Sequence, residues 1–167
     1  GCASIYYGTM EKLGIPKREI MVDRVKATQK TQVETKEVFA NALEQFKSVV
    51  NIKGGNLEAK YNKLSSALAK SEAAAAEVRD RIASVESVSE ALFKEWKGEL
   101  AQYSNVELRR SSESQLKASQ ANYRELITAM KKAESRLEPV LQPLRDQVLY
   151  LKHNLNAKAI GALSGEV

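Results

Sequence analysis

The chain has 167 residues, of which 43% are hydrophobic, 28% are charged and only 6% are aromatic. Its 8 glycines and 3 prolines are too few for a β-sheet protein rich in turns, whereas the abundance of Ala, Glu, Lys, Leu and Ser is typical of long helices. The formal net charge is +5, but both signs alternate along the sequence, which indicates a solvated helical surface and argues against a nucleic-acid partner.

The first segment, residues 1–16, is predicted to be an anchor that carries a short helix. It begins with Gly1 and Cys2, and a small residue before a cysteine is the pattern at which a bacterial lipoprotein signal ends. Lipid on Cys2 would hold the chain on a membrane, because each buried methylene contributes about 0.8 kcal/mol. The alternative interpretation is an incidental thiol. Gly14 and Pro16 then break the helix.

Three long helices are predicted to follow, at about residues 17–50, 57–103 and 105–164. In all three, apolar residues recur at alternating steps of four and three, which is the pattern of a coiled-coil seam. The paired glycines Gly54 and Gly55 mark the first loop. The middle helix has the most regular seam, formed by Leu57, Tyr61, Leu64, Leu68, Ser71, Ala75, Val78, Ile82, Val85, Ser89, Leu92, Trp96, Glu99 and Tyr103.

Two signals shape the last helix. Ser104 followed three residues later by Glu107 fits a capping box that opens it. Pro139 and Pro143 interrupt its sequence without changing the phase of its seam, so we expect a kink, or a restart capped by Ser135, rather than a domain boundary.

Short loops between long helices predict an all-α fold. We expect a single elongated antiparallel three-helix coiled-coil bundle over residues 17–164, with a short N-terminal helix and a kinked last helix. If the hairpins are tight, the numbers of facing residues add to about 107 for the first pair of helices and about 207 for the second. The short N-terminal helix should then cover the far end of the middle helix, and the last helix should overshoot its partners beyond Tyr150.

The overshooting end of the last helix and the neighbouring loop form the predicted interaction surface. We expect its apolar residues to continue the face of the bundle and to meet the loop or a second copy of the chain. The predicted surface comprises Leu151, His153, Asn154, Leu155, Asn156, Ile160, Gly54 and Gly55.

The sequence carries no pattern typical of catalysis or metal binding. His153 is the only histidine and Cys2 the only cysteine, which excludes a Cys–His metal cluster, and no phosphate-binding or zinc-protease motif is present. We therefore predict a non-enzyme without cofactor, metal or small-molecule substrate. Polar seam positions Thr28, Gln32 and Thr35 are predicted to set the register of the helices, the alternative being a ligand site.

Two stretches, residues 44–55 and 145–157, carry a family resemblance, and residues 151–156 are its most specific part. The chain resembles the DUF2959 family, a group of Gram-negative bacterial proteins of unknown function, over nearly its whole length. Many members resemble lipoproteins. The resemblance therefore implies a lipidated Cys2 and a periplasmic protein anchored to a membrane, with the outer membrane favoured; it implies no activity.

These observations lead to three functional hypotheses. The leading one is a non-enzymatic envelope lipoprotein whose helical rod acts as a scaffold, binding a protein partner or a second copy as a homodimer through its glycine tip and last helix. The alternative is a BAR-like module that binds a membrane surface along one side of the bundle, although the mixed charges argue against it. A ligand-binding protein that uses the polar seam positions is the third.

Overall fold

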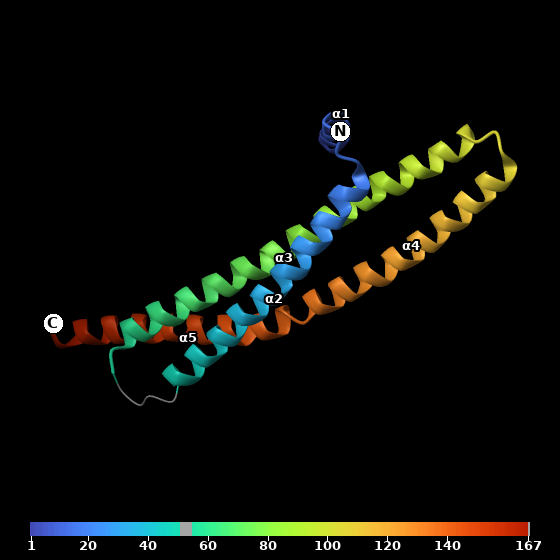
Figure 1. The fold of residues 1–167 in the computed structure, drawn as a ribbon. Helices are drawn as coiled ribbons and strands as arrows, with labels where there is room; N and C mark the ends of the chain where they lie inside the picture. The colour runs from blue at the N-terminus through green and yellow to red at the C-terminus, as the bar shows by residue number, and fades with distance from the viewer. Residues whose placement is uncertain (51–54, 167) are drawn as a thin grey trace. The chain divides into compact units, whose positions relative to one another are not determined.

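The computed structural model describes residues 1–50 and 55–166, which are helical and contain no strand. This confirms the all-α bundle with a short first helix and an interrupted last one (Figure 1). The elements are α1 (Cys2–Lys12), α2 (Lys17–Val50), α3 (Leu57–Glu99), the 3-10 turn η1 (Leu100–Gln102), α4 (Val106–Ser135), α5 (Glu138–Leu163) and the 3-10 turn η2 (Ser164–Glu166).

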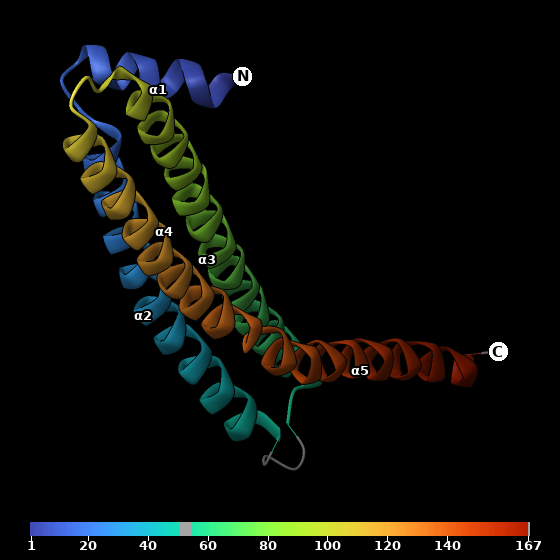
Figure 2. The ribbon, with the colours of Figure 1, turned by 90° about the vertical axis from the view of Figure 1, so that its right-hand side faces the viewer.

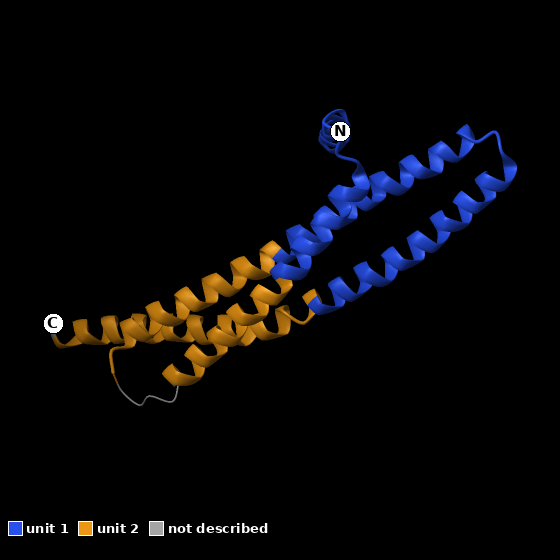
Figure 3. Ribbon diagram, viewed as in Figure 1, with its two compact units in different colours: residues 1–31, 78–133 blue, residues 32–77, 134–167 orange. Residues whose placement is uncertain are grey.

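The helices form two compact units, which are coloured separately in Figure 3. Unit 1 comprises residues 1–31 and 78–133, so it contains α1, the first part of α2, the later part of α3 and most of α4. Unit 2 comprises residues 32–77 and 134–167, so it contains the remainder of α2, the first part of α3 and all of α5.

Unit 2 has a core of aliphatic and aromatic side chains. Leu64 of α3 is completely buried, and Phe46 of α2 and Leu144 of α5 belong to the same cluster. Burial of each such side chain contributes roughly 1.5–3 kcal/mol. The cluster consists of Ala42, Phe46, Val49, Leu64, Ala67, Leu144 and Val148, and a second cluster consists of Phe39, Ala75 and Leu141.

In unit 1, α1 packs across α3 through one aromatic side chain. Tyr7 is buried against Val88 of α3 and Ile20 of α2. Figure 2 shows α1 as a short helix apart from the long ones. The sequence placed this short helix over the far end of the middle helix, but its buried contact lies at Val88, about three turns before the end of α3. Beyond Val88, α1 and the last turns of α3 face each other across a cavity whose lining includes Ser4, Gly8, Glu11, Gly98, Glu99 and Gln102.

Asparagine caps begin two of the long helices. The side-chain Oδ1 of Asn56 accepts hydrogen bonds from the backbone N–H groups of Glu58 at 3.0 Å and Ala59 at 3.2 Å. Gly55 precedes this cap with φ +93°, a conformation that favours glycine, whereas Gly54 lies outside the described residues.

The cap of α4 differs from the prediction. The Oδ1 atom of Asn105 accepts a hydrogen bond from the backbone N–H of Leu108 at 3.0 Å, so Asn105 is the N-cap and the predicted box of Ser104 with Glu107 is wrong by one residue. Asparagine is at least as good a cap as serine, and its longer side chain reaches the third N–H of the helix. The N-cap of α4 therefore lies one residue later in the chain than the sequence predicted.

Proline decides where the last long helix breaks. Residue 139 would donate its N–H to the carbonyl of Ser135 in a continuous helix, but Pro139 has no N–H and its ring clashes with that carbonyl. Accordingly α4 ends at Ser135, and α5 begins at Glu138 with Leu137 at the N-cap position and no side-chain cap. The break is therefore a restart, and the predicted cap by Ser135 is wrong.

The first hairpin has the predicted register. Arg24 Nη1 donates to the backbone oxygen of Ser84 at 2.9 Å in unit 1, and Thr35 Oγ1 donates to that of Ala74 at 3.5 Å in unit 2. Both pairs fall within two residues of the register expected for a tight loop. The seam that links α2 to α3 is therefore the coiled-coil seam read from the sequence.

The second hairpin departs from its predicted register away from the loop. Trp96 and Ser112 form a side-chain hydrogen bond close to the expected register, at 2.9 Å. Further along, however, the ring of Phe93 meets that of Tyr123 at 5.7 Å, although position 114 was expected opposite Phe93.

Candidate functional site

The predicted interaction surface on α5 divides between two faces of the helix. Leu151 and Leu155 are half-buried, and Leu151 packs against the Phe46–Leu64 cluster of unit 2. They continue the inner stripe of α5, which is formed by Leu141, Leu144, Val148, Leu151 and Leu155 in steps of three and four. This part of the prediction describes core packing rather than a free surface.

His153, Asn156 and Ile160 lie on the opposite side of α5, whereas Asn154 is half-buried on the side of Leu151. Ile160 follows Leu151 by nine residues, or about two and a half helical turns, so it does not continue the inner stripe as the sequence prediction assumed. It belongs instead to an outer stripe formed by Leu149, His153, Asn156, Ile160 and Leu163 in steps of four and three. The apolar residues of this outer stripe are exposed: Leu149 to 51%, Ile160 to 69% and Leu163 to 62%.

The end of α5 stands clear of the other helices of unit 2. Every residue from 156 to 165 is exposed, and both Figure 1 and Figure 2 show α5 continuing past the portions of α2 and α3 in this unit. Among the described residues, no hydrogen bond joins this helix to the glycine loop. There, Gly55 makes no hydrogen bond to His153, Asn154 or Asn156.

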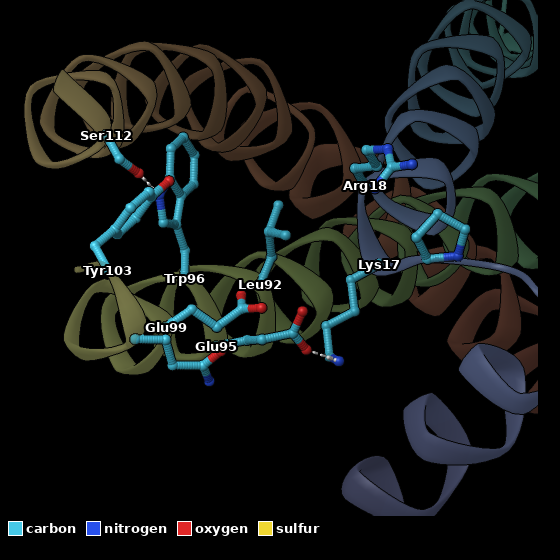
Figure 4. A pocket seen from close by; sticks show the side chains of 10 residues that line it. Lys17, Arg18, Leu92, Glu95, Trp96, Glu99, Tyr103 and Ser112 are labelled. Carbon is cyan, nitrogen blue, oxygen red and sulfur yellow. Dashed lines mark hydrogen bonds and ion pairs between the residues drawn. The ribbon is translucent and has the colours of Figure 1, made fainter. Parts of the chain in front are cut away.

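Unit 1 contains a groove between α3 and α4 that the sequence did not single out. Its volume is about 580 Å³, and Figure 4 shows the side chains of Trp96 and Tyr103 beside each other with Ser112 against the indole. The hydrogen bond from Trp96 Nε1 to Ser112 Oγ, at 2.9 Å, fixes the indole as a wall. The groove, called the α3–α4 groove below, is lined by Pro16, Lys17, Arg18, Leu92, Glu95, Trp96, Glu99, Gln102, Tyr103 and Ser112.

The start of α2 explains why this groove is open. Lys17, the first residue of α2, forms an ion pair with Glu95 of α3, so α2 begins at the level of Glu95. The helix α3 and the turn η1 continue to Gln102, and α4 begins at Val106. Over this last stretch of unit 1 the α3–α4 hairpin therefore lacks a third helix along the seam.

Lys17 is held between two helices by carboxylates. Its ammonium donates to Glu11 of α1 and to Glu95 of α3. Burial of Lys17 favours the neutral amine, but the hydrogen bonds to Glu11 and Glu95 outweigh it and raise the pKa of Lys17 above its ordinary value. The hydrogen bond from Lys17 lowers the pKa of Glu11. The cluster ties the C-terminal end of α1 to α3.

A second polar cluster ties the middle of α1 to α2 and α3. The hydroxyl of Tyr7 lies 2.8 Å from Ser87 Oγ and accepts a hydrogen bond from Arg24 Nη1 at 2.8 Å. The Arg24 guanidinium also lies over the rings of Tyr6 and Tyr7, at 5.6 and 5.4 Å. No local pattern in the sequence signals this cluster, because Arg24 and Ser87 lie 17 and 80 residues from Tyr7.

The outer face of α1 is apolar and includes the cysteine. The thiol of Cys2 is free and exposed. Tyr6, Thr9 and Leu13 follow it in steps of four and three, so they lie on the same side, with Ile5 beside them. Ile5 and Leu13 are about 70% exposed. Since Tyr7 alone of the two adjacent tyrosines is buried, Tyr6 remains on this outer face, which is called the α1 outer face below.

Comparison with known proteins decides the family. Residues 6–167 match the family described as Protein of unknown function (DUF2959). The chain belongs to the DUF2959 family. The match covers nearly the whole chain and confirms the resemblance carried by residues 44–55 and 145–157. No curated protein and no solved structure matches this DUF2959 chain.

The helices of this DUF2959 chain differ from membrane-spanning helices, and its acidic side chains are dispersed. Among the described residues, no helix combines the length and the hydropathy needed to cross a membrane. Within the same part of the chain, no three His, Cys, Asp or Glu side chains are grouped so as to hold a metal ion.

Proposed function

We propose that this DUF2959 protein is a non-enzymatic interaction module of the bacterial cell envelope. Lipid on Cys2 holds it on a membrane, and α5 binds a protein partner or a second copy of the chain. The observation that carries the proposal is the outer stripe of α5, in which Leu149, Ile160 and Leu163 are more than half exposed.

Helix energetics support a partner for the end of α5. Exposed residues 156–163 gain no tertiary packing in unit 2, although they continue the helix that packs there up to Leu155. A protein that covers Ile160 and Leu163 would supply that packing and remove apolar surface from water. His153 lies on the same stripe, beside Leu149 and Asn156, which fits a contact surface better than a reaction site.

The α1 outer face supports the membrane anchor. A lipid on Cys2 would emerge on the side that also exposes Ile5 and Leu13, with Tyr6 suited to the headgroup region. Stable anchoring usually requires two signals, and an apolar helix face beside the acyl chains would provide the second. We propose that this surface is a periplasmic one, with the outer membrane favoured, because the resemblance to lipoproteins implies it.

The partner surface is tested by replacing its apolar side chains with charged ones. Ile160→Glu with Leu163→Glu should abolish cross-linking of the protein to its partner in envelope preparations, whereas Leu108→Glu on α4, a leucine 58% exposed, should leave cross-linking unchanged. Circular dichroism should show all variants equally helical within a few percent. Equal cross-linking by the α5 variant and the wild type would contradict the proposal.

The anchor is tested separately, by fractionating bacteria that express the complete gene. The wild type should sediment with membranes and carry acyl chains on Cys2 by mass spectrometry, and Cys2→Ala should be soluble. If Cys2→Ala still sediments and binds anionic vesicles in a salt-sensitive way, the BAR-like alternative replaces the lipid anchor.

A further inference from the structure

We propose that the outer face of α4 binds an acidic helix of a partner protein. The inference goes beyond the contact proposed for α5, because it concerns unit 1 and a partner of defined charge. The surface is a row of exposed residues in steps of four and three, called the α4 basic stripe below. The stripe consists of Arg110, Ser114, Lys117, Ala121, Arg124, Thr128 and Lys131.

The net positive charge of the chain is confined to one of the two compact units. Unit 1 contains 16 lysines and arginines against 11 aspartates and glutamates, whereas unit 2 contains ten of each kind. The net charge of +5 therefore belongs entirely to unit 1. Charges that alternate along the sequence are thus unequally divided in the fold, and unit 1 is the part that attracts an anionic partner.

Within unit 1, the cations of α4 form a regular row. They repeat every seven positions, which places them on one side of the helix at intervals of about 10 Å. From Arg110 to Lys131 the stripe contains no acidic residue, although Glu107 precedes it and Glu113 and Glu125 border it. All residues of the stripe are exposed. The stripe is therefore a one-sided basic surface, which the alternating charges of the sequence concealed.

Three of the four cations are available to an external partner. Lys131 Nζ donates a hydrogen bond to Glu86 of α3 at 2.9 Å. Within residues 1–50 and 55–166, Arg110, Lys117 and Arg124 form no ion pair. A row of carboxylates at the same interval would meet these three side chains, and each contact would join opposite charges.

The repeat favours a helix as the source of those carboxylates. A helix that packs along another presents equivalent residues every seven positions, so acidic side chains at that interval would each meet one cation. Ser114, Ala121 and Thr128 alternate with the cations and leave room for the backbone of the partner. The stripe has no aromatic side chain on which a base could stack and no large apolar side chain that could enter a bilayer.

The stripe also faces away from α1. Tyr7 of α1 shares a hydrogen bond with Ser87 of α3, and Trp96 of α3 donates one to Ser112 of α4. Ser87 and Trp96 are nine residues apart, about two and a half helical turns, so α1 and α4 pack on opposite faces of α3 (Figure 1). If Cys2 holds α1 on a membrane as proposed, the stripe points away from that membrane, and its partner approaches from the aqueous side.

The experiment measures binding of a synthetic helix to the full chain by fluorescence anisotropy. The probe is a dye-labelled, alanine-rich peptide of about four heptads with glutamate at every seventh position. The control peptide has the same composition, but its glutamates are distributed around the helix. The probe should bind about tenfold more tightly than the control, and its affinity should fall as salt is added. Equal affinities of the two peptides would overturn the inference.

Single charge reversals locate the binding site. Lys117→Glu should weaken binding of the probe by about tenfold, because it places a carboxylate opposite a carboxylate. Lys26→Glu, at an exposed position of α2, makes the same change in the net charge of unit 1 and should alter the affinity by less than about threefold, since its charge is screened from α4. Equal weakening by both variants, or loss of binding in Lys158→Glu on α5, would overturn the inference.

Reversal of the whole stripe gives a test that does not depend on loss of binding. The triple variant Arg110→Glu, Lys117→Glu and Arg124→Glu should reject the glutamate probe and bind a peptide with lysine at the same positions. Circular dichroism should show it as helical as the wild type. A helical triple variant that still prefers the glutamate probe would overturn the inference.

Other anionic surfaces are tested with the same chain carrying Cys2→Ala. Phosphatidylglycerol vesicles and double-stranded DNA should bind no better to the wild-type stripe than to Lys117→Glu. If either binds in a way that Lys117→Glu weakens, while the two peptides bind equally, the partner is a membrane or a nucleic acid and the inference falls. The α5 variant Ile160→Glu with Leu163→Glu should bind the probe normally, so failure of the proposed function would be seen separately.

Discussion

The two compact units hold the same kinds of helices together by different means. In unit 2, α5 packs on α2 and α3 through Phe46, Leu64, Leu144 and their apolar neighbours. In unit 1, directional contacts also hold α1. Tyr7 bonds Ser87 and Arg24, and Lys17 of α2 bridges Glu11 of α1 to Glu95 of α3. Apolar burial contributes free energy over a continuous area, whereas hydrogen bonds and ion pairs contribute little net free energy but demand one geometry.

The difference indicates separate roles for the two units. Unit 2 has the packing to serve as the stable part, and it leaves the end of α5 exposed beyond its core. Unit 1 uses polar contacts to hold a short helix, whose outer face exposes Cys2, and a groove of definite shape beside Trp96. Specific contacts thus lie where we propose that the protein binds membrane and partner.

The largest effect is expected in the core of unit 2. Leu64→Ala, at a completely buried position, should lower the free energy of unfolding by about 2–5 kcal/mol because it leaves a cavity among Phe46, Leu144 and their neighbours. Urea denaturation followed by circular dichroism measures this loss. Leu163→Ala, on the exposed end of α5, is the control and should change the free energy of unfolding by less than about 0.5 kcal/mol. Equal losses would refute the assignment of the core.

A smaller effect is expected for the polar contacts of unit 1. Tyr7→Phe keeps the buried ring but removes the hydroxyl that bonds Ser87 and Arg24, so it should cost about 1–2 kcal/mol. Tyr6→Phe, on the exposed side of α1, is the matched control and should be neutral. If both variants unfold at the same urea concentration, Tyr7 contributes only its ring, and the contrast between the units is lost.

The sequence was sufficient for the parts that depend on local periodicity. Seam spacing located α2 at residues 17–50 and predicted the seam that Arg24–Ser84 and Thr35–Ala74 confirm. The error at Ile160 was one of interpretation, because the apolar residues beyond Tyr150 were treated as a single face. Helical spacing from Leu151 already assigns Ile160 to the other face, and the exposure of Ile160 agrees with it.

The sequence contained the information needed to predict the groove in unit 1, but one assumption prevented that prediction. The expected register already placed the start of α2 opposite about residue 90, leaving the end of the middle helix without a partner. The short first helix was assumed to cover that end. It covers one side only, where Ser4, Gly8 and Glu11 of α1 face the last turns of α3 across a cavity, and the side lined by Trp96 and Tyr103 stays open.

The cap of α4 tests the hairpin that forms the outer wall of the groove. Asn105→Ala removes the side-chain acceptor of the Leu108 N–H and should cost about 1 kcal/mol, measured by thermal unfolding. Ser104→Ala should be nearly neutral, since serine at this position does not cap the helix. The reverse order of effects would restore the capping box predicted from the sequence and contradict the structure.

The smallest effect, and the most specific to unit 1, is the dependence of stability on pH. Folding lowers the pKa of Glu11 below its ordinary 4.5 because Lys17 donates a hydrogen bond to its carboxylate. A folded state that binds the proton less tightly than the unfolded chain is stabilised above the unfolded pKa, and this stabilisation is lost as pH falls through the folded pKa. Glu11 and Glu95 are about 40% exposed, so solvent screening keeps the effect small.

Thermal unfolding of the wild type and of Lys17→Met between neutral pH and pH 3 isolates this contribution. The wild type should lose stability relative to Lys17→Met as pH falls below about 4.5, because only the wild type has an ion pair to lose. Lys12→Met, which removes an exposed lysine from the same end of α1, should run parallel to the wild type throughout. If Lys17→Met also runs parallel, the bridge between α1 and α3 contributes nothing to stability, and Tyr7 with its partners must hold α1 in place.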